Sequence, residues 1–220
     1  MKSLVNQMNR EMHRDLTPIV SHKLGDKFRE SIESGVVCKL DLSSVAFGAS
    51  LMVNPTKVEE RRLRDMDGFF HDQEAYNGAD KQELVYRTYY FNFDGMSCAI
   101  TDMFPGSIGN EFYLTKGHFH EPPGMSEVYI FLRGHGVSVM QHRSKKKPVL
   151  IAPLMQGTVV FSPPFYAHRT VNIGRDVLSW ISIFNTKARL DYEPIVKEGF
   201  RALIIEKDGR ATFTMNTSHI

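Results

Sequence analysis

The sequence lacks the features that mark secreted, membrane-spanning and nucleic-acid-binding proteins. It contains only two cysteines, Cys38 and Cys98, and they form no CxxC pair, so neither a disulfide framework nor a thiolate metal site is expected. No apolar run approaches the roughly 18 residues that span a bilayer, and the N-terminal segment has no apolar signal-peptide core. The formal charge of +2 provides no broad basic face. We therefore expect a cytoplasmic protein with neither a membrane nor a nucleic-acid partner.

Fixed-period repeats and low-complexity stretches are also absent from the 220 residues. Hydrophobic residues make up 42% and charged residues 24%, which is typical of one well-cored soluble domain with an extension. We place the extension at residues 1–55 and the main domain at residues 56–220. The one basic cluster, residues 143–147, lies between two strand-like runs and is predicted to be a solvated hairpin loop.

The first part of the chain gives weak and mixed signals. Apolar residues recur at helical spacing from Leu4 to Leu16, before a proline that would stop a helix. The segment Gly35–Val53 is irregular and β-rich. The charged segment Val58–Met66 contains good helix formers, and Gly68 follows it, so a short helix is predicted there.

From Leu84 to Phe184 the sequence becomes a series of short β-type runs that glycine and proline separate at hairpin-like intervals. A last hairpin is predicted from Leu203–Glu206 and Ala211–Met215, joined through the tight-turn dipeptide Asp208-Gly209. Tyr192–Glu198 is predicted to be a short helix. Many evenly spaced strands with few helices indicate an all-β antiparallel sandwich or barrel.

Three histidines and one glutamate form the strongest functional signal. His118 and His120 are two residues apart in a strand-like run, so both imidazoles point to one side, roughly 6.5–7 Å apart along the backbone. Glu127 begins the next apolar run, and His168 follows a Pro-Pro turn downstream. Three imidazoles and a carboxylate suit a borderline divalent metal and leave two positions open on an octahedral ion.

The alternative is that these histidines have no common role, because a lone strand histidine is most often a surface or satisfied core residue. That interpretation applies to His13, His22, His71, His142 and His219. His135 lies in a Gly-rich turn and is interpreted as a turn residue. An HxH pair alone is a weak signal, but HxH followed by the glutamate and by the Gly-Pro-His block is much stronger.

In their order, these residues resemble the two motifs of the cupin family. The first motif corresponds to His118, His120, Glu127 and Gly134, and the second to Gly157, Pro163, His168 and Asn172. The chain departs from the family in a longer gap before the glutamate and in Phe165, where the motif often has glycine. The resemblance implies a double-stranded β-helix, or jelly-roll barrel, with a few peripheral helices and an N-terminal extension.

A closer resemblance, to the cupin-type glucose-6-phosphate isomerases of archaea and some bacteria, runs from about Arg61 to Phe213. It is carried by TKGHFH, EVY, GTVV, PP-x-x-AHRTVNIG, RRL-x-DM and KEGF. It implies reversible conversion of glucose 6-phosphate to fructose 6-phosphate, a step of glycolysis and gluconeogenesis, in a homodimer. It also implies one divalent ion per subunit, which could be Fe, Mn, Zn, Ni or Co.

The same resemblance implies roles for further residues. Thr101, Thr115 and Gly117 match positions that contact the substrate phosphate, although a threonine in such a run can equally be an ordinary β-branched strand former. Glu127 could act as proton-transfer base as well as ligand, but a metal-bound carboxylate is a weakened base, and a hydride shift would need no base. Tyr129 could donate a hydrogen bond to substrate oxygens, or it could be a core aromatic.

Three positions near the expected pocket bear on substrate choice. Tyr192 keeps the family pattern and is a possible substrate contact, whereas Phe184 replaces a tyrosine and Leu190 replaces a histidine of the family. Two other functions therefore remain open: another metal cupin enzyme, such as a dioxygenase or an isomerase of a different sugar phosphate, and a non-catalytic cupin that binds a sugar.

Overall fold

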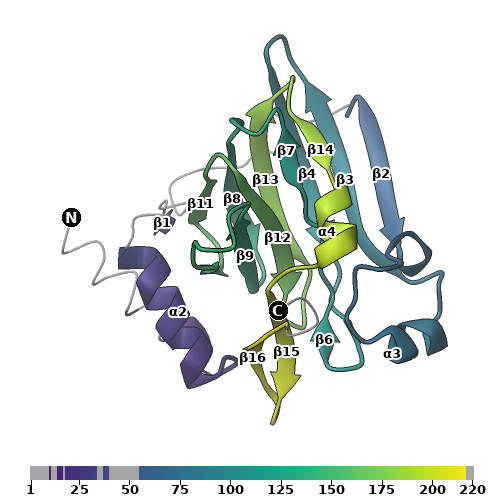
Figure 1. Cartoon of the computed structure of the whole chain (residues 1–220), viewed down its shortest axis with the longest axis vertical. Coiled ribbons are helices and arrows are strands. Elements are labelled where there is room, and N and C mark those ends of the chain that lie inside the picture. The colour runs from purple at the N-terminus through teal and green to yellow at the C-terminus, as the bar shows by residue number, and fades with distance from the viewer. Residues whose placement is uncertain (1–9, 11–13, 17, 34–36, 40–54, 217–220) are drawn as a thin grey trace.

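The computed structural model describes residues 10, 14–16, 18–33, 37–39 and 55–216, and in these residues antiparallel strands dominate (Figure 1). The helices are α2 His22–Glu33, the 3-10 helix η2 Leu63–Asp65, α3 Gln73–Gly78 and α4 Glu193–Glu198. The strands are β1 Val37–Lys39, β2 Lys57–Arg62, β3 Leu84–Asn92, β4 Met96–Met103, β5 Ser107–Ile108, β6 Glu111–Phe112, β7 Phe119–Glu121, β8 Glu127–Arg133, β9 Gly136–His142, β10 Leu150–Leu154, β11 Thr158–Ser162, β12 Tyr166–Asn172, β13 Leu178–Asn185, β14 Arg189–Asp191, β15 Ala202–Lys207 and β16 Arg210–Met215. None of the helices in these residues is both long and apolar enough to cross a bilayer.

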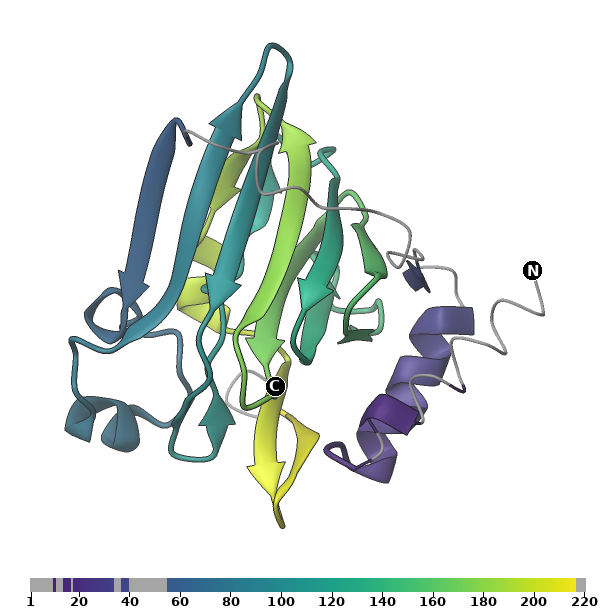
Figure 2. The ribbon, with the colours of Figure 1, turned by 180° about the vertical axis from the view of Figure 1, so that it is seen from behind.

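Two facing layers of strands form the barrel. The larger layer has seven strands in the order β1-β11-β8-β13-β4-β3-β2, and Figure 2 shows it from the side opposite to Figure 1. The second layer contains β10-β9-β12, and bridges from Val171 to Leu114 and from His168 to His118 join β12 to the segment that enters β7. β14 then pairs with β7. The expected all-β antiparallel barrel is confirmed in the described residues.

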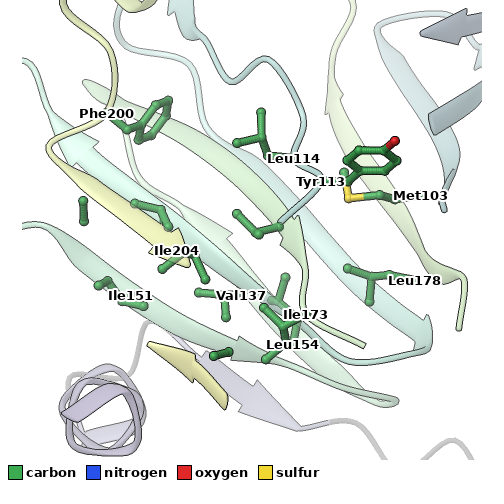
Figure 3. Close-up of a cluster of buried hydrophobic side chains, with 14 of the residues drawn as sticks. Met103, Tyr113, Leu114, Val137, Ile151, Leu154, Ile173, Leu178, Phe200 and Ile204 are labelled. Atoms are coloured by element: carbon green, nitrogen blue, oxygen red, sulfur yellow. The ribbon is translucent and has the colours of Figure 1, made fainter. Parts of the chain in front are cut away.

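The inner face of the large layer changes from apolar to polar along its strands. On β13, Leu178 is fully buried in the core, whereas Ser182, four residues further along the same face, lines a cavity. The same change occurs on β4 between Met103 and Thr101. Figure 3 shows the apolar part, where Leu178 and Met103 belong to one cluster of buried side chains. The core thus closes one part of the barrel and leaves the rest for a polar cavity.

The segment that leads into β7 contains one residue more than the strand beside it. Four steps along the chain separate Leu114 from His118, but only three separate their bridge partners, His168 and Val171. Gly117 takes up the irregularity with a φ of 69°. A Cβ at this glycine would lie 2.5 Å from the Phe200 ring, so the bulge requires glycine.

The predicted helix at Val58–Met66 is wrong. Residues 57–62 form strand β2, and only Leu63–Asp65 makes a single 3-10 turn. β2 pairs with β3, and Glu60 accepts two hydrogen bonds from the Arg87 guanidinium across the pair. Pairing with a neighbouring strand therefore overrides the helix propensity of Glu and Arg.

Most other local predictions are confirmed within the described residues. The strands from Leu84 to Phe184, the last hairpin through Asp208-Gly209 and the short helix near Pro194 are all present. Residues 143–147 form the loop between β9 and β10 as expected. The helices α2 and α3 were not predicted, and α3 begins with a capping bond from the Ala75 amide to Asp72.

Part of the N-terminal extension falls outside the described residues. Of the helix expected over Leu4–Leu16, positions 10 and 14–16 are helical and the others are not described. Of the β-rich segment Gly35–Val53, the described residues 37–39 form a strand that pairs with β11. Helix α2 contacts β10 and β16. The division into an extension, residues 1–55, and a domain, residues 56–220, stays a prediction.

The backbone at Phe165 leads to a first testable prediction. Its φ of 71° is a conformation that costs a non-glycine residue about 1–2 kcal/mol, and the side chain is 50% exposed, so it has little packing to lose. Phe165→Gly should therefore leave the free energy of unfolding unchanged or raise it by up to about 1 kcal/mol in urea titrations. The matched control is Phe161→Gly, at a 44% exposed position inside β11, which should lose about 1 kcal/mol. Equal losses in the two variants would contradict the prediction.

Candidate metal centre

The four residues selected from the sequence meet at one point of the barrel. One donor atom from each of His118, His120, Glu127 and His168 lies within 4.8 Å of all the others. The strands position them: His120 comes from β7, Glu127 from the start of β8 and His168 from β12, where a backbone bridge holds it opposite His118. All four are buried or half-buried.

The spacing of the donor atoms matches the shell of a single ion. Nε2 of His168 lies 3.2 Å from Nε2 of His118 and 3.3 Å from Oε2 of Glu127, and Nε2 of His120 lies 3.1 Å from the same oxygen. Adjacent ligands at right angles, each about 2.1 Å from an ion, are about 3 Å apart. The donor set and its dimensions therefore fit a divalent metal.

Two of the imidazoles have an oxygen next to the other ring nitrogen. Nδ1 of His168 is 2.8 Å from the Ser162 hydroxyl, and Nδ1 of His120 is 3.4 Å from the Met125 carbonyl oxygen. A proton on Nδ1 would be donated to these oxygens, which leaves the lone pair of Nε2 directed at the centre. Such outer hydrogen bonds are a regular feature of metal-binding histidines.

The protonation states also suit cation binding. Burial alone would raise the pKa of Glu127, but the close contacts of its carboxylate with His120 and His168 outweigh it and hold the pKa well below its ordinary value. Burial, and then the neighbouring His168, lower the pKa of His118 well below its ordinary value. At neutral pH the site thus presents a carboxylate and an uncharged His118, the forms that bind metals.

A cavity of about 440 Å³ opens beside the four donors. His118, Glu127 and His168 line it, as do Thr101 and Thr115 and the backbone of Gly117. The hydroxyl of Thr101 is 3.1 Å from that of Thr88, and Oγ1 of Thr115 accepts a hydrogen bond from the Thr170 amide. The expected phosphate contacts therefore share one cavity with three of the four expected metal ligands.

The aromatic and apolar positions singled out from the sequence line the same cavity: Tyr129, Phe184, Leu190 and Tyr192. Tyr129 lies with its ring centroid 5.6 Å from that of His168. Burial, and then the negative charge of Glu127, raise the pKa of Tyr129 well above its ordinary value, so its hydroxyl remains a donor. Leu190 lies directly opposite His120 in the β14–β7 pair.

Sequence reasoning missed the charged wall of the cavity. Alternate residues of β2, Lys57, Glu59 and Arg61, line it, and Glu59 forms ion pairs with both cations. Lys116, inside the TKGHFH stretch, lines it too. The alternating charges of β2 indicate which side chains share one face of a strand. The sequence predicts a helix over residues 58–66, and in a helix alternate residues do not share a face.

Comparisons with known proteins point to one family. Residues 53–219 match the family model described as glucose-6-phosphate isomerase. The chain is 37% identical over 161 residues to the glucose-6-phosphate isomerase of Thermococcus kodakarensis, covering 71% of this chain and 84% of the relative. For the Pyrococcus furiosus enzyme of the same name the identity is 36% over 172 residues, with 75% and 89% covered. A putative glucose-6-phosphate isomerase of Rhizobium meliloti is 30% identical over 181 residues, with 79% and 81% covered.

Among solved structures, the oxalate decarboxylase of Lactobacillus farciminis in its formate complex aligns with a TM-score of 0.42 and 17% identity. The alignment covers 52% of this chain and 33% of that one, so the chain spans about a third of the solved protein.

Proposed function

The chain belongs to the glucose-6-phosphate isomerase family, and from that premise we propose that it interconverts glucose 6-phosphate and fructose 6-phosphate with one bound divalent metal ion. The observation that carries the proposal is the meeting of four donor atoms, within 4.8 Å of one another, on the wall of a cavity rich in hydroxyl groups. His118, His120, Glu127 and His168 would hold the ion.

Each part of the proposed reaction has a group suited to it. A bound divalent ion would act as a Lewis acid that polarises the carbonyl of the sugar and so acidifies the neighbouring C–H bond. Tyr129, whose hydroxyl stays protonated, is suited to donate a hydrogen bond to a sugar oxygen. Thr101, Thr115 and the Gly117 amide offer neutral donors for the phosphate at the other end of the substrate.

Two routes for the hydrogen that moves between C1 and C2 are compatible with these groups. Glu127 is a carboxylate at neutral pH and could carry the proton between the two carbons. Because a carboxylate that also binds a cation is a weak base, a direct hydride shift is the alternative. When fructose 6-phosphate reacts in deuterated water, deuterium at C2 of the glucose 6-phosphate product shows that a proton is carried, since a hydride shift takes no hydrogen from the solvent.

Four further properties are proposed on the family resemblance. The ion would be iron, manganese, zinc, nickel or cobalt, because these accept mixed imidazole and carboxylate ligands. The enzyme would be a cytoplasmic homodimer that works in glycolysis and gluconeogenesis. Elemental analysis of the purified protein and light scattering test the metal and the dimer.

Removal of the metal gives the decisive test of the activity. Purified protein should convert fructose 6-phosphate to glucose 6-phosphate, measured by coupling the product to glucose-6-phosphate dehydrogenase. Chelation should lower the rate by more than about 100-fold, because the Lewis acid contributes several kcal/mol to the barrier, and added Mn²⁺ or Fe²⁺ should restore it.

Each competing function predicts a different result. Oxygen consumption with a ferrous ion would indicate a dioxygenase. Turnover of another sugar phosphate at a higher kcat/KM would correct the substrate. Metal and sugar binding with no turnover would indicate a binding protein, and isomerase activity that ignores the chelator would contradict the metal mechanism.

A further inference from the structure

The charges that line the cavity do not balance. Three cations, Lys57, Arg61 and Lys116, face two carboxylates, Glu59 and Glu127. Glu127 belongs to the cluster of metal donors, and Glu59 is shared between Lys57 and Arg61. Lys116 is left over: none of the ion pairs among the described residues includes it.

The ammonium group of Lys116 lies near two aromatic rings, Phe69 and Tyr192, of which Tyr192 lines the cavity. Its Nζ is 5.1 Å from the centroid of Phe69 and 5.9 Å from that of Tyr192. The positive charge of Arg61 repels it, and the negative charges of Asp65 and Glu59 attract it, although neither carboxylate forms an ion pair with it. A half-buried cation that stands beside a second cation and forms no ion pair of its own is a group that a bound anion would stabilise.

An irregularity of the backbone around Lys116 directs this residue toward the cavity. In a regular strand alternate residues face opposite sides, yet the consecutive residues 115–118 all line the cavity. The extra residue between Leu114 and His118 explains this, because a bulge redirects side chains that regular pleating would turn away. Arg169 is buried, and its guanidinium donates a hydrogen bond of 2.9 Å to the Lys116 carbonyl oxygen. This bond holds the bulged backbone in place.

We infer that Lys116 binds the phosphate group of the substrate and thereby selects phosphorylated sugars over unphosphorylated ones; the inference rests on the proposed isomerase function. Neutral hydroxyls and an amide can orient a phosphate dianion, but only a cation offsets its charge when the group leaves water. Lys116 stands two residues from the metal donor His118, on the same wall of the cavity. A sugar whose carbonyl end lies at the metal donors can therefore extend its phosphate toward Lys116.

The test compares Lys116→Met with Lys116→Gln and Lys116→Arg. Loss of the cation should raise KM for fructose 6-phosphate about 10- to 100-fold, the range for a hydrogen bond to a charged group, and change kcat less than about threefold. Lys116→Arg should recover most of the loss. Lys197→Met, on the exposed side of α4 and outside the cavity, removes the same charge and should leave KM unchanged. The dissociation constant of inorganic phosphate, measured by calorimetry, should rise in parallel with KM in the Lys116 variants.

The outcomes separate this inference from the proposed function. If the wild type isomerises the sugar and both Lys116→Met and Lys116→Gln keep its KM and its phosphate affinity within twofold, the inference is wrong and the function stands. If the wild type has no isomerase activity but loses phosphate binding in the Lys116 variants, the function is wrong and the anion site stands. Thermal unfolding of each variant shows whether it is folded; should Lys116→Met not fold, Lys116→Gln, which keeps a polar side chain, carries the comparison.

Discussion

Replacing His168 with alanine should leave a folded protein that no longer holds a metal ion tightly and has lost isomerase activity by roughly 1,000-fold or more. Nε2 of His168 lies next to the donor atoms of both His118 and Glu127, so its removal opens one side of the donor cluster. The several kcal/mol that a Lewis acid contributes to such a barrier correspond to this loss in rate. Metal content by elemental analysis and kcat/KM in the coupled assay measure the two effects.

His142 offers a matched control for His168. It lies on β9, beside the strand that carries His168, but outside the cluster of donors. His142→Ala should keep both the metal content and the activity within about threefold of the wild type. Retention of one bound ion per chain and of full activity by His168→Ala would refute the assignment of the metal site.

Gly134→Ala should lower the free energy of unfolding by about 2–5 kcal/mol, the largest stability effect we expect from adding a single methyl group. Gly134 has a φ of 83°, and a Cβ there would lie 2.7 Å from the Leu178 Cα atom and from the Val177 carbonyl oxygen. Backbone atoms cannot relieve such a clash by changing rotamer, as a side chain can. The conformational cost of about 1–2 kcal/mol is therefore added to an overpacking cost of about 1–3 kcal/mol. Urea unfolding followed by circular dichroism measures the change.

Gly209 separates the two contributions. Its φ of 71° is similar, but a Cβ there would meet no atom within 4 Å. Gly209→Ala should therefore show only the conformational cost, about 1–2 kcal/mol. If the two alanine variants lose equal stability, the close approach of the Val177–Leu178 backbone has no energetic effect.

The candidate metal site could be predicted because its signal is local in the sequence. His118 directly precedes β7, His120 lies in it and Glu127 opens β8, so the period of an extended chain is enough to direct them to a common side. The contribution of His168 depends on the pairing of β12 with the segment before β7, which no local pattern reveals. The sequence signals for His168 are the Pro-Pro turn before it and, in addition, its place in the order of the family motifs.

The elements that were mispredicted depend on tertiary structure. β2 is made of residues that favour helices in isolation, and pairing with β3 decides its conformation. Helix α2 buries Leu24 and Phe28, which have a helical spacing but lie in a segment with little other signal. Lys116 could not be assigned from the alternation of a regular strand, because the bulge that directs it into the cavity appears only when the two strands are paired.

The extra residue before His118 makes it possible to alter recognition and catalysis separately. His118 keeps its bridge to His168 on one side of the insertion, and Leu114 keeps its bridge to Val171 on the other. Shortening this segment by one residue would restore an even ladder with the histidines still in register, and would leave one side chain fewer in the cavity. A metal-binding barrel can thus acquire or lose a contact for one end of its substrate by a single-codon insertion or deletion, and protein engineers could use the same position to change which sugars enter.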